Sequence, residues 1–416
     1  MAGESICPIT AVSTRPKSGV VTLARIIGVA RVSICQWAGQ PWSCFCNFRI
    51  PVYSLVEETD VKCITIKSLF TVVTSALLLL STLNAQAGQN SAPVLLYHHV
   101  SKDTPASTSV SPETFSEHMA YIAENHTVLP LSEIVDAARN GESLPDNALA
   151  ITFDDGYANI LKNAHPVLQQ HGFPYTIFIN PQTIDSRADQ LTWQQVETMS
   201  EEGVTFANHT ADHLHMLDRK PDENEKDWLR RVWQNVEQAQ QKLASHINEP
   251  KKYLAYPFGE YNQRLAQKVK QAGYVGFGQH SGAIGPHSDF AALPRFPSAG
   301  PYATLKSLKT KMNSLAMPVS SSTVANPEFS RDQQPETVSL TIEGDDVRLS
   351  QASCYYRGSA IDTRVEKKTL TFTLQSAIPT GRSRVNCTAP SKAHSGKYYW
   401  YSQPFFVAGK DGNYPD

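Results

Sequence analysis

Two short polar motifs contain residue types that can do chemistry. Asp154 and Asp155 directly follow one apolar run, and His209 and His213 lie four residues apart after another. Two histidines at this spacing can turn their imidazoles toward one point and bind a single cation. One carboxylate with two imidazoles suits zinc and leaves a coordination position open for water. The alternative is a polar turn between a strand and a helix, with Asp155 or Gly156 capping the helix.

The elements that must position these motifs can be read from the apolar runs. From Pro93 onward, short apolar runs alternate with amphipathic segments about six times, which is typical of a parallel sheet, open or closed into a barrel. In such folds, ligands gather at the carboxyl ends of the strands. His98 and Pro257 also come just after apolar runs. We therefore expect these residues and the two motifs to meet at one edge of the sheet.

Three segments together resemble the polysaccharide deacetylases of carbohydrate esterase family 4. They are Thr152–Gly156, His209–His213 and Tyr256–Gly259, and the resemblance covers about residues 93–312. The first two segments are specific in combination, and the third is weaker alone. The resemblance implies an α/β fold, namely a distorted (β/α)7-type barrel.

The resemblance also implies roles for single residues. The metal ligands would be Asp155, His209 and His213, with His215 as an alternative to His213. Zinc is the expected metal, and another divalent transition metal is possible. Asp154 would be the base that takes a proton from water, while the backbone N–H of Phe258, next to Pro257, would help hold the oxyanion.

The proton donor departs from the usual family pattern. In most of the family a Leu-x-His near the end of the domain supplies the acid, but residues 300–317 contain no histidine. Leu96-Tyr97-His98 has that form at the beginning of the domain, which looks like the permuted arrangement of the biofilm poly-N-acetylglucosamine deacetylases. His98 is therefore the expected acid, with His99 as the alternative.

A second departure concerns the arginine that braces the base. The usual Arg-x-Pro-Tyr-Gly segment appears here without its arginine, as Ala255–Gly259. Arg295 is the candidate to supply that charge from elsewhere; the alternative is an ordinary surface arginine. His280 and His287 lie in a glycine-rich loop, where we expect them to face solvent or substrate rather than the metal.

Composition and the N-terminal segment indicate the compartment. The 416 residues are 41% hydrophobic and 18% charged, which is ordinary globular composition, and a net charge of −2 argues against a nucleic-acid partner. Residues 61–87 have the basic start, apolar middle and Ala-Gln-Ala finish of a secretory signal peptide. We expect export with cleavage; the alternative is a membrane anchor over residues 68–83. Residues 1–60 are expected to be a non-native or disordered extension.

The remaining chain divides into three predicted parts. Residues 88–316 would form the catalytic domain, residues 317–336 a linker rich in Ser, Pro, Asn and Gln, and residues 337–416 a small β-sandwich. Cys354 and Cys387 are the only cysteines after residue 87, so we expect them to form a disulfide. Closing a loop of that size contributes about 3 to 4 kcal/mol in the chain-entropy model.

These patterns predict an exported, zinc-dependent hydrolase that removes acetyl groups from N-acetylglucosamine units of a polysaccharide. One alternative keeps the chemistry but acts on an O-acetylated polymer such as xylan. A non-haem iron oxygenase also uses two histidines and a carboxylate, though usually as a close His-x-Asp pair on a β-barrel. A carbohydrate-binding protein without activity would not need Asp154 beside the metal.

Overall fold

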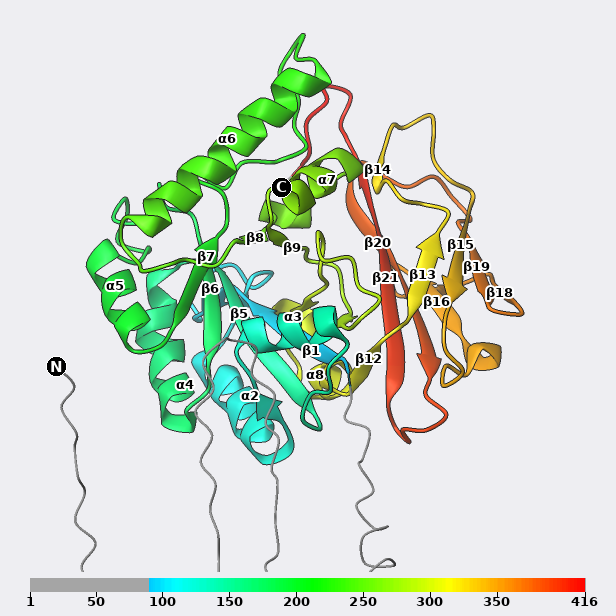
Figure 1. Cartoon of the computed structure of the whole chain (residues 1–416), viewed down its shortest axis with the longest axis horizontal. Coiled ribbons are helices and arrows are strands. Elements are labelled where there is room, and N and C mark those ends of the chain that lie inside the picture. The colour runs from blue at the N-terminus through cyan, green and yellow to red at the C-terminus, as the bar shows by residue number, and fades with distance from the viewer. Residues whose placement is uncertain (1–89, 416) are drawn as a thin grey trace, which may run out of the picture. The chain divides into compact units, whose positions relative to one another are not determined.

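The computed structural model describes residues 90–415, which form an α/β region followed by two C-terminal β-sheets (Figure 1). The expected extension and signal peptide, residues 1–87, lie outside the described residues. No helix in residues 90–415 is long and apolar enough to cross a membrane.

A curled, largely parallel sheet forms the centre of the α/β region. Its parallel strands are β1 (Ala92–Tyr97), β5 (Ala148–Asp155), β6 (Tyr175–Ile179), β7 (Thr205–Asn208), β8 (Tyr253–Ala255) and β9 (Val275–Phe277), paired in this order. The short strands at the margins are β4 (Thr127–Val128), β10 (Ala283–Ile284) and β11 (Phe296–Pro297), with β2 (His99–Val100) and β3 (Ser109–Val110) forming a separate pair. Because β11 pairs with β1 and Leu293 bridges to Phe277 of β9, the sheet turns back toward its first strand. The predicted α/β class is confirmed.

Helices cover the sheet, and they explain why its strands are apolar throughout. They are α2 (Pro112–Asn125), α3 (Leu131–Asn140), α4 (His165–His171), α5 (Trp193–Glu201), α6 (Glu225–Ala244), α7 (Gln263–Gln271) and α8 (Leu305–Met312). Figure 1 shows α2, α4 and α5 along strands β5 to β7. Ile151 and Ile177 belong to one buried cluster, whereas their neighbours Ala150 and Phe178 belong to another. Both faces of the strands are therefore buried, as in other parallel sheets.

The C-terminal region consists of a mixed sheet and an antiparallel sheet with a common core. The first contains β12 (Ser314–Ala316), β14 (Glu328–Phe329), β16 (Ser353–Tyr356), β17 (Ser359–Ile361), β20 (Gly381–Pro390) and β21 (Tyr398–Val407). The second contains β13 (Val319–Ser322), β15 (Thr337–Ile342), β18 (Thr363–Glu366) and β19 (Thr369–Thr373). Leu340 and Phe372 of the second sheet share one hydrophobic cluster with Val385 and Phe405 of the first. The two sheets therefore enclose one apolar core.

The prediction that residues 317–336 form a linker is partly wrong. It contains β13 and β14, which pair with β15 and β21. Its polar composition hides short strands whose few apolar side chains, including Val319 and Phe329, pack against the C-terminal core. The segment is therefore integrated into the sheets.

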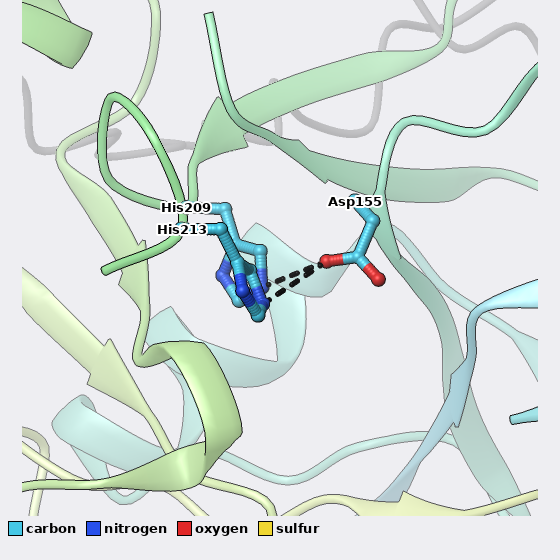
Figure 2. A group of neighbouring side chains, drawn as sticks. All are labelled: Asp155, His209 and His213. Carbon is cyan, nitrogen blue, oxygen red and sulfur yellow. Dashed lines mark ion pairs between the residues drawn. The ribbon is translucent and has the colours of Figure 1, made fainter. Parts of the chain in front are cut away.

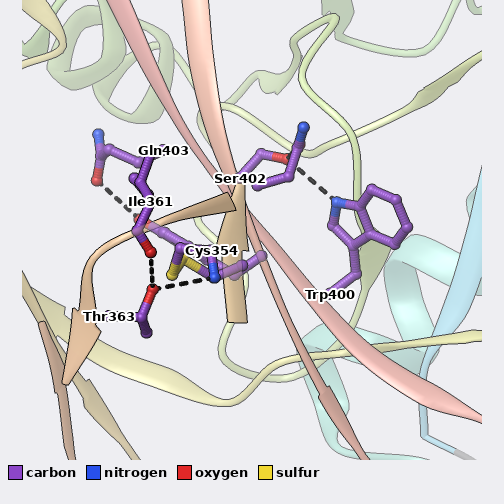
Figure 3. Close-up of a disulfide and its surroundings, with 9 residues drawn as sticks. Cys354, Ile361, Thr363, Trp400, Ser402 and Gln403 are labelled. Atoms are coloured by element: carbon purple, nitrogen blue, oxygen red, sulfur yellow. Dashed lines mark hydrogen bonds between the residues drawn. A yellow bond between two sulfur atoms is a disulfide. The ribbon is translucent and has the colours of Figure 1, made fainter. Parts of the chain in front are cut away.

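The expected disulfide joins Cys354 of β16 to Cys387 of β20. The two residues are direct partners in the antiparallel register, and both are fully buried. Figure 3 shows the disulfide beside Thr363, whose hydroxyl accepts a hydrogen bond from the Cys354 N–H at 3.2 Å. The disulfide thus connects neighbouring strands inside the C-terminal core.

Candidate active site

Three side chains converge at the carboxyl edge of the curled sheet, as Figure 2 shows. Asp155 is the last residue of β5, and His209 directly follows β7. Oδ1 of Asp155 lies 3.2 Å from Nε2 of His209 and 3.4 Å from Nε2 of His213. The ligand atoms of the three residues all lie within 4.8 Å of one another, which is close enough for one ion to bridge them.

The chemistry of these three donors fits a cation. Nδ1 of His209 is 2.8 Å from the carbonyl oxygen of Ala255, the last residue of β8, so it donates its proton there and leaves the Nε2 lone pair facing Asp155. His209 Nε2 and Asp155 Oδ1 are buried and lack a hydrogen-bond partner among the described residues. Two buried acceptors that face each other are satisfied by a cation between them.

The surroundings shift the pKa values of His209 and His213 in opposite directions. Burial lowers the pKa of His209, but the neighbouring carboxylates of Asp154 and Asp155 outweigh burial and raise it. Burial lowers the pKa of His213 to about 4. His213 therefore presents an unprotonated nitrogen at neutral pH, as a metal ligand must.

Unusual backbone conformations aim these side chains. Asp155, His213 and Phe258 have φ angles of 75°, 59° and 58°, in the left-handed region that costs most residues free energy. Gly156 follows Asp155 at a φ of 72°, and a Cβ there would lie 2.8 Å from the side chain of Ile179. Glycine is therefore required where β5 turns away from the site.

Asp154 is held separately from the three converging groups. Its carboxylate accepts two hydrogen bonds from Arg295, at 2.7 Å from Nη1 and 2.8 Å from Nη2, and both side chains are fully buried. Arg295 also donates from Nε to the Gly278 carbonyl oxygen at 3.0 Å. Burial raises the pKa of Asp154, but the charges of Arg295 and His209 outweigh it and lower that pKa. The arginine predicted to brace the aspartate is thus in contact with it, and it is not a surface residue.

His98 and His99 follow β1 with different surroundings. His99 is buried, its ring stacks on Tyr157 with centroids 3.6 Å apart, and its Nδ1 accepts from the Asn159 amide at 2.8 Å. Burial lowers the pKa of His99 to about 4. His98 is only half-buried. Burial raises the pKa of Asp155, but His209 and the nearby His98 outweigh burial and lower it. Of the two, His98 is the one whose ring remains available near Asp155.

The segment after β8 lies against the two histidines that follow β7. Pro257 is buried and begins a short 3₁₀ turn, Pro257–Gly259, and the ring of Phe258 meets His213 edge-on with centroids 4.5 Å apart. His215, the alternative ligand, lies outside the group of three, with its Nδ1 3.1 Å from Oε2 of Glu260. His280 and His287 line a separate cleft of about 550 Å³ beside β21.

Sequence reasoning missed two residues here. Glu260 is fully buried and lies next to the Tyr256–Gly259 motif, so its position after the motif could have drawn attention to it. Arg382, in β20, lies 3.4 Å from Glu260 through its Nη1. It is 122 positions away in the chain, and no local pattern connects the two.

Comparison with known proteins identifies the α/β region. A sequence model of the polysaccharide deacetylase family matches residues 141–277. The putative polysaccharide deacetylase YxkH of Bacillus subtilis is 27% identical over 207 residues, which cover 49% of this chain and 70% of that protein. The chain carries a polysaccharide deacetylase domain. The matched range of this domain includes Asp154, the three converging residues and Phe258, whereas His98 and Arg295 lie outside it.

One further curated protein and one solved structure are similar to this chain. The poly-beta-1,6-N-acetyl-D-glucosamine N-deacetylase of Staphylococcus epidermidis is 28% identical over 265 residues, which cover 56% of this chain and 91% of that protein. The structure of IcaB from Ammonifex degensii aligns with a TM-score of 0.48 and 18% identity, over 54% of this chain and 98% of that one.

Proposed function

We propose that the deacetylase domain is a metal-dependent enzyme that removes N-acetyl groups from poly-β-1,6-N-acetylglucosamine. The relative from Staphylococcus epidermidis, named for that activity, supports the choice of polymer. The observation that carries the proposal is the separation of the two aspartates. Asp155 faces the two histidines, whereas Asp154 points to Arg295 and stands 3.9 Å from His209 Nε2, close to the metal position but not part of the ligand set.

In this proposal, Asp155, His209 and His213 hold a divalent cation, and the two imidazoles and one carboxylate favour zinc. A zinc ion held there would lower the pKa of a water molecule and polarise the acetyl carbonyl. Because burial lowers the pKa of His213 to about 4, that ligand needs no deprotonation near neutral pH.

The remaining steps use groups of the chain. Asp154 takes a proton from the attacking water while the water oxygen forms a bond to the acetyl carbon. The backbone N–H of Phe258 donates to the negative charge that develops on the acetyl oxygen. His98 then gives a proton to the sugar nitrogen as the carbon–nitrogen bond breaks, so that acetate and a free amine leave. Arg295 keeps Asp154 ionised and oriented through its two hydrogen bonds.

An extracellular polymer requires an exported enzyme. The basic, apolar and Ala-Gln-Ala pattern of residues 61–87 supports export, and the disulfide between Cys354 and Cys387 suits an oxidising compartment. We therefore place the mature enzyme outside the cytoplasm, where it meets the polysaccharide.

The direct test is acetate release from four polymers before and after metal removal. We expect release from poly-β-1,6-N-acetylglucosamine to exceed that from chitin oligomers, peptidoglycan and acetylxylan. EDTA should abolish the release and added zinc should restore it. Activity that is indifferent to chelation contradicts the metal site, and release from acetylxylan alone contradicts N-deacetylation.

A further inference from the structure

The ring of Phe258 is surrounded by side chains from three parts of the chain. The His215 ring stacks on it almost in parallel, with centroids 3.8 Å apart and an interplanar angle of 5°. The guanidinium carbon of Arg382 lies 4.8 Å from the ring centroid, within cation–π range. His213, one of the proposed metal ligands, meets the ring edge-on. The position of this ring is thus coupled to a ligand of the proposed metal site.

Glu260 connects the two groups that flank the ring. Its carboxylate is fully buried, with Oε2 3.1 Å from Nδ1 of His215 and Oε1 3.4 Å from Nη1 of Arg382. A buried carboxylate requires partners of this kind, and here it has one from the deacetylase domain and one from the C-terminal sheets. One contiguous group, which we call the Phe258 clamp, therefore consists of Arg382, Glu260, His215 and Phe258.

The C-terminal sheets hold Arg382 in a fixed place. Strand β12 pairs with β21, and the side-chain amide of Asn262 donates to Oε2 of Glu328 in β14 at 2.7 Å. The rings of Tyr261 and Phe406 meet edge-on with centroids 5.7 Å apart. Tyr261 and Asn262 lie immediately after the Phe258 segment in the chain, so the β20–β21 sheet contacts the α/β region next to the place where Arg382 reaches the clamp.

We propose that Arg382 is a positioning residue of the active site, which acts through Phe258 and Glu260 and gives the C-terminal sheets a part in the reaction. This inference rests on the proposed function and deepens it. The left-handed conformation of Phe258 is costly, and the clamp fixes its ring from outside the turn. Fixing the ring keeps the Phe258 N–H aimed at the oxyanion position and limits the movement of the His213 ring.

The test is the Arg382→Met variant, which keeps the length of the side chain but removes its charge and planar head. We expect kcat to fall about tenfold and zinc affinity about threefold to tenfold, at or below the lower end of the range for direct partners of metal ligands because Arg382 acts through the Phe258 ring, with KM within about twofold of wild type. Arg382→Lys retains attraction to Glu260 but not planar stacking, so it should recover part of both losses. The matched control is Arg364→Met in β18, whose side chain is 83% exposed and whose loss should change neither quantity.

A second variant tests whether Arg382 and Glu260 act together. Glu260→Gln should lower kcat to a similar extent, and the double variant should lose little more than either single variant, because both substitutions break the same clamp. Fully additive losses overturn the proposal. So do wild-type kcat and zinc affinity in Arg382→Met, or a rise in KM alone, which would make Arg382 a substrate contact.

Failure of the proposed function is distinguishable from failure of this inference. A wild-type protein that releases no acetate from any of the four polymers contradicts the proposed function. Zinc affinity, measured by competition with a chelator, still compares Arg382→Met with wild type in that case. If Arg382→Met does not fold, Arg382→Lys and Glu260→Gln provide the same comparison of zinc affinity.

Discussion

The edge of the curled sheet and the C-terminal sheets are both well packed, but they use opposite kinds of contact. At the edge, the Asp154–Arg295 ion pair is fully buried, the buried Glu260 carboxyl contacts His215, and several residues adopt costly backbone conformations. The C-terminal sheets instead enclose an apolar cluster and a disulfide. Buried charge and strain contribute orientation rather than stability. Substitutions at the edge should therefore act mainly on chemistry, and substitutions in the C-terminal core mainly on stability.

The largest expected effect comes from Asp154→Asn. The variant keeps an oxygen that can accept from Arg295 but cannot take a proton from water. We expect turnover to fall about 10²- to 10⁴-fold, the usual contribution of a general base, with bound zinc unchanged. Acetate release and metal content of the purified protein measure the two quantities.

The control for this variant is Asp146→Asn, a change at an exposed aspartate in the same domain. It should leave turnover and zinc content as in wild type. Thermal unfolding of Asp154→Asn shows how much stability is lost when the buried Arg295 charge loses its ionised partner. Unchanged turnover in Asp154→Asn would remove this residue from its role as base.

The next largest effect concerns His213 and His215, the two histidines between which the sequence leaves the third metal ligand open. His213→Gln should weaken zinc binding about 100-fold, because it removes a proposed ligand. His215→Gln should weaken it less than about tenfold, because His215 contacts Glu260 and the Phe258 ring and acts only through them. Competition with a chelator measures both affinities, and the opposite ranking would make His215 the ligand.

The sequence predicted which side chains meet wherever their placement depends on local motifs. Asp155, His209 and His213 each lie beside the end of an apolar strand, and the parallel arrangement brings those ends together. Arg295 was found for a different reason, since the missing motif arginine left a charge to be supplied from elsewhere. In each case, the local sequence alone implies a chemical requirement.

The sequence was insufficient where contacts join distant parts of the chain. Arg382 reaches Glu260 across 122 positions, and neither residue belongs to a periodic or motif pattern that would pair them. The prediction of a linker over residues 317–336 was wrong for a related reason. β13 and β14 are short and polar, and their existence depends on pairing with β15 and β21 rather than on local propensity.

A third, smaller effect concerns the C-terminal sheets, where substitutions should act on stability rather than on chemistry. Replacing Cys354 and Cys387 together by alanine should lower the free energy of unfolding by about 3 to 4 kcal/mol, because the unfolded chain regains the freedom that the closed loop removes. While the protein is folded, kcat should stay within about twofold of wild type. Denaturant unfolding and acetate release under the same conditions check both values. A loss of kcat as large as that of Arg382→Met would show that the two regions are not separable in this way.

The smallest expected effect concerns the decrease of the free energy of unfolding at acidic pH. The buried histidines in residues 90–415 (His99, His118 and His209) all lie in the α/β region. His118, in α2, is fully buried, with Nε2 2.7 Å from the Ala303 carbonyl oxygen and Nδ1 3.1 Å from the Tyr97 hydroxyl. Burial outweighs the hydrogen bond to Ala303 and lowers the pKa of His118 below its usual value near 6.5. The unfolded chain therefore binds a proton at pH values where the folded protein does not, and the free energy of unfolding falls as the pH drops below that value.

The slope that one such histidine contributes is at most about 1.4 kcal/mol per pH unit. His118→Gln should remove this contribution and flatten the decline of stability below about pH 6.5. The exposed His287 provides the control, since His287→Gln should keep the wild-type slope. Denaturant unfolding at several pH values measures the slope for each protein. An unchanged slope in His118→Gln would mean that acid sensitivity of the α/β region comes from its other buried charges, such as the Asp154–Arg295 pair, whose contribution is lost only when Asp154 is protonated at lower pH.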